Sequence, residues 1–172
     1  MVSHVPSIRT LGPHEWRAYR ALRLRALAES PDVFATTLAE AQERNDADWQ
    51  RQVASGAEPR SQAALVAEIE AQRVGLAWCQ LDDSNPNRVH LFQMWVHPSF
   101  RRLGIARELL NAAIRWAATL EAREIVLSVP SLQSAAVRLY TSTGFLPVGD
   151  PQPIKPGSEL LAQTMQLDLR SA

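Results

Sequence analysis

The sequence predicts an α/β fold, with a sheet of about seven strands in a single domain that spans residues 1–172. A length of 172 residues is typical of one domain. The composition, 46% hydrophobic and 21% charged, supplies enough apolar material for a core. Stretches of alternating apolar residues are interspersed with stretches of helical periodicity. We therefore expect a strand, two helices, three strands, a helix, a strand, a helix and two strands, in that order.

The first half of the chain predicts helices followed by a hairpin. Pro13 and Glu15 are typical of the first turn of a helix. Asn45 and the acid after it interrupt the second helical region. Two apolar runs flank a short turn at 71–72, which predicts a hairpin. The expected elements are a strand over 5–11, a helix over 13–30, a helical region over 36–54, and strands over 63–70 and 74–81.

The second half carries the stronger signals. Residues 88–96 are nearly all apolar or aromatic, which predicts a central strand. Ser131 is the expected N-cap of the last helix, and Gly144 its C′ residue. The expected elements are the strand over 88–96, a helix over 104–120, a strand over 124–129, a helix over 131–143, a strand over 145–149, a proline-rich loop over 150–157 and a strand over 160–169.

Arginine supplies almost all of the positive charge. Of the 18 basic residues 17 are arginine, Lys155 is the only lysine, and 18 acidic residues balance them. No glycine is followed by lysine, which excludes a P-loop, and Lys155 lies between prolines in a predicted loop, which is unsuitable for a Schiff base. The neutral balance argues against nucleic acid as a partner. Four arginines spread around the first helix and are expected mainly to face solvent, with a binding role open for one or two: Arg17, Arg20, Arg23 and Arg25.

The single cysteine, Cys79, excludes an internal disulfide and a cysteine-rich zinc site, and we expect no metal. Its apolar neighbours predict a buried, inert thiol on a strand. No apolar run reaches 18 residues, and nothing resembles a signal peptide. We therefore expect a cytoplasmic protein that does not bind a membrane.

The segment Arg101-Arg102-Leu103-Gly104-Ile105-Ala106 joins the predicted central strand to the strongest predicted helix. The N-terminus of a helix presents unpaired N–H groups and the positive end of the helix dipole, which suit a phosphate group. Gly104 and Ala106 are small, so that phosphates can approach the backbone. An ordinary tight turn between strand and helix accounts for these six residues equally well.

The flanking residues resemble the signature of the Gcn5-related N-acetyltransferase (GNAT) superfamily. Its acetyl-CoA motif, Gln/Arg-x-x-Gly-x-Gly/Ala after a strand, is matched by Arg101, Gly104 and Ala106. Further matches at the family's usual spacing are Met94-Trp95-Val96-His97-Pro98 before the motif, and Ala136-Val137-Arg138-Leu139-Tyr140 and Gly144-Phe145 after it. The order of elements is similar over almost the whole chain. The resemblance implies a mixed, mostly antiparallel sheet with helices on both faces.

The resemblance also implies an acetyl-CoA site. The co-substrate would lie in a V-shaped gap between the strands over 88–96 and 124–129, with its pyrophosphate held at 101–107 mainly by backbone N–H groups. The implied binding residues are Met94, Trp95, Val96, Arg101, Arg102, Leu103, Gly104, Ile105, Ala106, Arg107 and Gln133. At Gln133 the family often has asparagine, and the longer amide cannot make similar hydrogen bonds from the same place.

Tyr140 is the general acid that the resemblance implies, since the family places this phenol near the CoA sulfur. A core aromatic packed against the sheet is the plainer interpretation of the same residue. For the base, histone-acetylating relatives have a glutamate eleven residues before the motif. His90 stands there in this chain, and an imidazole can accept a proton near neutral pH. The alternatives are Glu40, Glu43 and a chain of water molecules.

The resemblance implies transfer of an acetyl group from acetyl-CoA to a primary amine by direct attack, without a covalent enzyme intermediate. The acceptor is expected to be a small molecule or a peptide amine, and a homodimer is left open. Peptide N-termini, polyamines, amino-acid-like toxins and aminoglycosides all fit. Two other classes stay open. One is a non-catalytic acyl-CoA sensor on the same fold, and the other is a protein-interaction domain that binds a different phosphate ligand.

Overall fold

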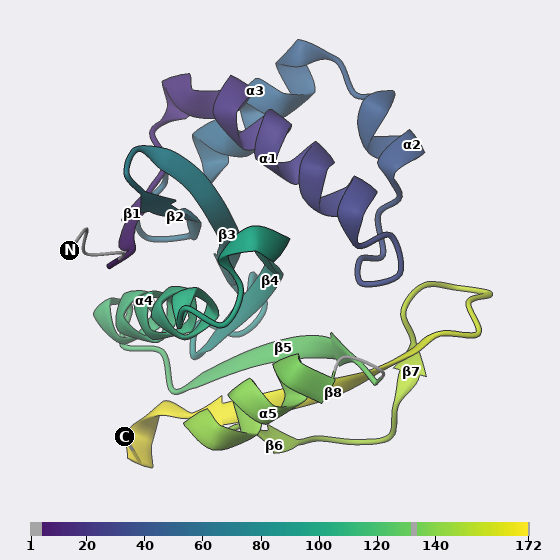
Figure 1. Cartoon of the computed structure of the whole chain (residues 1–172). Helices are drawn as coiled ribbons and strands as arrows, with labels where there is room; N and C mark the ends of the chain where they lie inside the picture. Colours follow the sequence, from purple (N-terminus) through teal and green to yellow (C-terminus); the bar gives the residue numbers. More distant parts are fainter. Residues whose placement is uncertain (1–4, 132–133, 172) are drawn as a thin grey trace.

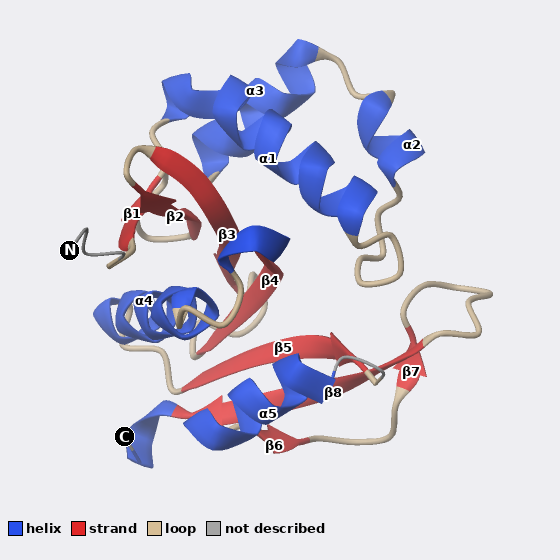
Figure 2. Ribbon diagram, in the orientation of Figure 1, coloured by secondary structure: helices blue, strands red, loops and turns tan. Residues whose placement is uncertain are grey.

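The computed structural model describes residues 5–131 and 134–171, which form five α-helices and eight strands (Figures 1 and 2). A 3-10 turn at Pro13–Glu15 precedes the first α-helix. The helices are α1 (Trp16–Glu29), α2 (Leu38–Gln42), α3 (Asp46–Ser55), α4 (Ile105–Thr119) and α5 (Ser134–Thr143). The strands are β1 (Ser7–Thr10), β2 (Gln62–Ile69), β3 (Gln72–Leu81), β4 (Arg88–Val96), β5 (Glu124–Pro130), β6 (Leu146–Pro147), β7 (Gln152–Pro153) and β8 (Leu161–Asp168).

The strands form one mixed sheet in the order β1-β2-β3-β4-β5-β8-β6, with β7 paired to β8. Only β4 and β5 run parallel, and the other described pairs are antiparallel. β4 has the predicted bounds and the predicted central position. The eighth strand, β7, corrects the expectation of a plain loop over 150–157. A two-residue strand that ends in proline has no alternation that a sequence pattern can detect.

The sheet has a core on each face, because successive side chains of a strand point to opposite sides. In β2, Leu65 and Ala67 belong to the core that includes α4 and α5, whereas Ala64 and Val66 belong to the core that includes α1 and α3. Figure 1 shows α1, α2 and α3 together on one side of the sheet and α4 on the other. Helices on both faces are thus confirmed.

Two capping boxes divide the second helical region into α2 and α3. Thr37 Oγ1 accepts a hydrogen bond from the N–H of Glu40 (3.2 Å), and the Glu40 carboxylate accepts one from the N–H of Thr37 (2.7 Å). Asn45 Oδ1 accepts a hydrogen bond from the N–H of Asp48 (3.0 Å). The interruption predicted at Asn45 is confirmed. The Glu40 carboxylate forms part of the N-terminal cap of α2.

The end of α5 agrees with the prediction. Gly144 follows the helix with a φ of +108°, and the N–H of Phe145 donates to the carbonyl of Tyr140 (3.0 Å). The helix is described from Ser134 onward. The predicted role of Ser131 as N-cap stays a prediction, because residues 132–133 lie outside the described residues. The N–H of Ser131 donates to the carbonyl of Leu161 (2.9 Å).

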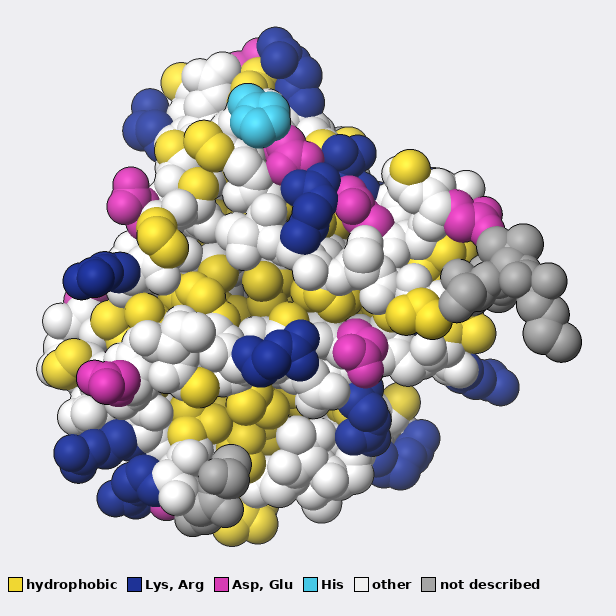
Figure 3. All heavy atoms as spheres, turned by 90° about the vertical axis from the view of Figure 1, so that its left-hand side faces the viewer, with side chains coloured by type: hydrophobic (Ala, Val, Ile, Leu, Met, Phe, Trp, Pro, Cys, Tyr) yellow, Lys and Arg dark blue, Asp and Glu magenta, His cyan; other side chains and the backbone are white. Residues whose placement is uncertain are grey.

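The surface carries charges of both signs. Figure 3 shows acidic and basic side chains interspersed over the face that it presents, with hydrophobic side chains between them, in line with the balanced charge. Among the described residues, no helix has both the length and the apolar character needed to cross a bilayer.

Candidate active site

A cleft opens where the central strands β4 and β5 separate. Their parallel pairing runs from Arg88 opposite Glu124 to Leu91 opposite Leu127 and then stops. Just beyond this point Gln93 has a φ of +58°, and an extra residue of β4 disturbs the register with β3, which is a β-bulge. The bulge bends β4, so beyond the separation the strand edge that faces β5 has no partner among the described strands.

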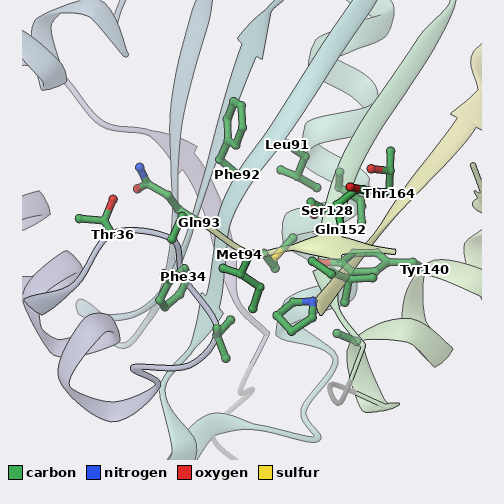
Figure 4. Close-up of a pocket in the computed structure, with 18 of the residues that line it drawn as sticks. Phe34, Thr36, Leu91, Phe92, Gln93, Met94, Ser128, Tyr140, Gln152 and Thr164 are labelled. Carbon is green, nitrogen blue, oxygen red and sulfur yellow. The ribbon is translucent and has the colours of Figure 1, made fainter. Parts of the chain in front are cut away.

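The cleft has a volume of about 430 Å³, a size that suits a small ligand. Its lining comes from α1, the segment before α2, β4, β5, α5, β7 and β8. Figure 4 shows Gln93 and Met94 on one side of it and Tyr140 on the other. Among the described residues that line it, Arg23 and Tyr140 are the titratable ones.

Tyr140 reaches the cleft from α5 (Figure 4). Its side chain is 5% exposed, and its ring centre lies 5.7 Å from that of Phe145. Burial, with no hydrogen bond from a described residue to offset it, raises the pKa of the phenol to about 12. The phenol is therefore protonated at neutral pH and can donate a proton or a hydrogen bond into the cleft.

The loop between β4 and α4 has the geometry of an anion-binding nest. Arg102 and Gly104 have positive φ angles of +65° and +79°, which turn successive N–H groups toward one side. Within the described part of the chain, the N–H groups of residues 102–107 donate to no backbone acceptor. They lie at the N-terminus of a 15-residue helix, at the positive end of its dipole. This arrangement fits a pyrophosphate.

Arg101 holds this loop to the rest of the protein. Its Nε donates to the carbonyl of Val96 (2.9 Å), and its Nη2 donates to Glu29 Oε2 (2.8 Å). The same Glu29 oxygen accepts a hydrogen bond from Trp95 Nε1 (2.9 Å). One carboxylate thus joins the end of α1 to the end of β4. The Arg101 guanidinium is thus paired with Glu29 and Val96 at the surface, and the cofactor-binding role predicted for Arg101 stays a prediction.

The other predicted acetyl-CoA residues lie along β4 and the loop. Met94 lines the cleft, and Trp95 and Val96 pair with β3 alone. In the loop and α4, Arg102 and Leu103 are exposed, Ile105 is buried, Ala106 is half-buried, and Arg107 Nη2 donates to Ser142 Oγ (3.1 Å). The remaining predicted residue, Gln133, lies outside the described residues.

The three candidate bases are not among the residues that line the cleft. His90 Nε2 lies 2.7 Å from Asp82 Oδ2, and the imidazole stacks on Phe92 with ring centres 5.6 Å apart. This hydrogen bond is the largest cause that holds the pKa of Asp82 well below its usual range. Glu40 caps α2, and Glu43 lies at the end of the same helix. The structure brings Tyr140 to the cleft without any of these bases.

Several polar residues of the cleft were not singled out from the sequence, and Arg23 and Gln93 are two of them. Arg23 on α1 is 6% exposed and lines the cleft. Gln93 occupies the bulge, and its Oε1 accepts a hydrogen bond from the Tyr19 hydroxyl (2.5 Å). The sequence contained one indication that each of these two residues is not on the solvent face. Arg23 follows Leu22 and lies one helical turn after Tyr19, on the apolar side of α1, and Gln93 is an amide within an otherwise apolar run.

Known proteins share this sequence pattern. The sequence model of the Acetyltransferase (GNAT) family matches residues 21–145. Mycothiol acetyltransferase of Kocuria rhizophila is 29% identical over 133 residues, which are 75% of this chain and 42% of that protein. N-acetylaspartate synthetase of Danio rerio is 33% identical over 94 residues, which are 55% of this chain and 33% of that protein. The chain thus spans less than half the length of these relatives.

Solved structures share the fold along nearly the whole chain. An acetyltransferase of the GNAT family from Streptococcus pneumoniae superposes with a TM-score of 0.81 at 20% identity, covering 95% of this chain and 99% of that one. YncA of Salmonella typhimurium, solved with its cofactor acetyl-CoA, superposes with a TM-score of 0.77 at 22% identity, covering 95% of this chain and 94% of that one. With the family match over most of the sequence, these observations show that the chain belongs to the GNAT acetyltransferase family.

Proposed function

We propose that this protein transfers the acetyl group of acetyl-CoA to a primary amine. The observation that carries the proposal is the cleft between β4 and β5. It places the protonated phenol of Tyr140 beside the strand edge that leads directly into the N–H nest at residues 102–107. An acyl donor with a phosphate-bearing tail fits that combination.

The loop and the open edge of β4 would hold acetyl-CoA. The N–H groups of residues 102–107 would bind the pyrophosphate, and the exposed guanidinium groups of Arg102 and Arg107 would add positive charge beside it. The backbone of residues 94–96 would pair with the pantetheine arm as an added strand does. Backbone N–H groups at the bulge would stabilise the charge that develops on the thioester oxygen.

The amine nitrogen would attack the thioester carbon directly. The C–S bond then breaks, the sulfur leaves as the CoA thiolate, and Tyr140 donates to that sulfur as its charge develops. The amine gives up a proton in the same step. His90 stays the predicted side-chain base, and because its imidazole does not line the cleft, the proton would reach it through water.

The names of the relatives do not identify the acceptor of this protein. The names of the two relatives above point to different compounds, mycothiol in one and N-acetylaspartate in the other. A small-molecule or peptide amine is therefore the class that we propose here. The expected cytoplasmic location and the homodimer stay predictions.

Release of CoA thiol from acetyl-CoA, measured with a panel of amines, tests the proposal. Cys79 is fully buried, and burial raises the pKa of its thiol to about 12, so a thiol reagent reports CoA alone. We expect release that depends on the amine, together with an amine product that carries one added acetyl group. Binding of acetyl-CoA with no release above spontaneous hydrolysis would support the acyl-CoA sensor instead and contradict an acetyltransferase.

A further inference from the structure

A buried arginine that has no hydrogen-bond partner among the described residues lines the α1 side of the cleft. Arg23 is 6% exposed, and its guanidinium carbon lies 4.4 Å from the centre of the Phe34 ring. Its Nη1 is buried with no hydrogen-bond partner among the described residues. The charged or ionisable groups that influence it are Tyr19 and Arg44, and neither is a carboxylate. A buried cation that no described carboxylate pairs is costly, so it indicates a ligand that supplies the missing charge.

A relay of hydrogen bonds leaves Gln93 as a second donor in the same cleft. Arg44 can only donate, so Gln52 Oε1 must be the acceptor of its 2.6 Å bond. Gln52 Nε2 then donates to the Tyr19 hydroxyl (3.0 Å), and that hydroxyl donates its proton to Gln93 Oε1 (2.5 Å). The amide nitrogen of Gln93 is left to donate. Gln93 and Arg23 both line the cleft (Figure 4 shows Gln93).

We propose that this side of the cleft binds a carboxylate of the acceptor, so that the acceptor is a small amino-acid-like amine. The proposal rests on the acetyltransferase function proposed above and narrows its acceptor. A guanidinium presents two parallel N–H groups that match a carboxylate, and the Gln93 amide can add a third hydrogen bond. A polyamine would instead bring further positive charge toward Arg23 and Arg44. The volume of about 430 Å³ favours a small molecule over a folded polypeptide.

Acceptor pairs that differ only in the carboxylate test this proposal. The panel is the common α-amino acids, their carboxamides, β-alanine, γ-aminobutyrate and spermidine, each with saturating acetyl-CoA. We expect the preferred amino acid to exceed its own carboxamide about 10- to 100-fold in kcat/KM, mostly through a lower KM, as a charge-assisted hydrogen bond allows. Spermidine should be the poorest acceptor.

Variants of Arg23 assign the preference to this residue. Arg23→Met keeps the length of the side chain and removes an unpaired buried charge, so the melting temperature should stay the same or rise. The preference for the acid over the amide should fall to about one. Arg23→Lys keeps the charge without the planar fork and should give an intermediate preference. Arg20→Met, on an exposed part of the same helix where Arg20 pairs with Asp46 at 3.5 Å, should keep the full preference.

The outcomes separate this inference from the proposed function. A carboxylate preference that Arg23→Met and Arg23→Lys reduce, and Arg20→Met does not, supports the inference. Thiol release that is equal or faster with carboxamides or spermidine overturns the inference and leaves the acetyltransferase in place. A carboxylate preference that survives in both Arg23 variants also overturns it. No release with any acceptor, while acetyl-CoA still binds, overturns both.

Discussion

Replacing Tyr140 by phenylalanine removes one oxygen from the cleft and keeps the packing of the ring. That ring lies 5.7 Å from Phe145, centre to centre, and burial alone accounts for the raised pKa of the phenol. No described partner therefore loses a hydrogen bond when the oxygen is removed. We expect the free energy of unfolding to change by less than about 1 kcal/mol.

The raised pKa bounds what the Tyr140 phenol contributes to the reaction. An ordinary thiol has a pKa of about 8.5, roughly 3.5 units below the value of about 12 for Tyr140. Complete proton transfer to the CoA thiolate then costs about 5 kcal/mol, at about 1.4 kcal/mol per unit. The phenol therefore acts mainly by donating a hydrogen bond to the developing thiolate, which contributes about 1.5–3 kcal/mol. That range corresponds to a fall in kcat of about 10- to 150-fold.

Steady-state thiol release and the affinity for CoA, measured by calorimetry, check this expectation for Tyr140→Phe. The affinity serves as the internal control, because the ring and the nest stay in place and the Kd for CoA should not change. A kcat within about twofold of the unsubstituted protein would refute the role of the phenol. A raised Kd with an unchanged kcat would make Tyr140 a binding residue only.

Three further predictions concern the base, the nest and stability in acid. His90→Gln should remove the acidic limb of the pH profile of kcat/KM, and a limb that stays would reject His90 as the base. An added methyl group at Gly104 has space, but a φ of +79° is unfavourable for any residue with a side chain. Gly104→Ala should therefore distort the nest, raise the KM for acetyl-CoA several-fold and lower the free energy of unfolding by about 1 kcal/mol. An unchanged KM would argue against the nest. The hydrogen bond from Arg9 holds the pKa of Glu15 at about 2, so the stability from this pair is complete above about pH 4.5 and is lost as the pH falls toward 2. In urea unfolding, Glu15→Gln should therefore lessen the loss of stability over that interval, and an identical pH dependence would contradict the assignment.

The sequence predicted those parts of the fold that local patterns determine. The bounds of β4 follow from an apolar run between a turn cluster and a proline, and the break at Asn45 follows from its capping box. β7 was missed because its two residues are held only by pairing with β8, which is a tertiary contact. The mixed, mostly antiparallel character of the sheet was implied by the family resemblance and not by any local pattern.

For the site, the motif residues were predictable and their partners were not. Gly104 and Tyr140 occupy fixed positions in a family motif; in the structure Gly104 precedes α4 and Tyr140 lines the cleft. Arg101 was expected among the residues that bind acetyl-CoA, whereas its ion pair with Glu29, which is 72 residues away in sequence, could not be predicted. Arg23 is one of four arginines on α1, and only the packing of that helix against the sheet decides which of them is buried. Such choices depend on contacts between distant segments, which a local pattern does not contain.

Mass analysis of the products tests the central claim most directly. The intact protein is incubated with acetyl-CoA and a mixture of α-amino acids and their carboxamides, and both the acceptors and CoA are followed over time. We predict that free CoA accumulates in step with an N-acetylated amino acid, and that Tyr140→Phe slows both to the same extent. Acetyl-CoA that binds tightly but is recovered intact, with no acetylated amine, would contradict the assignment of this cleft to acetyl transfer.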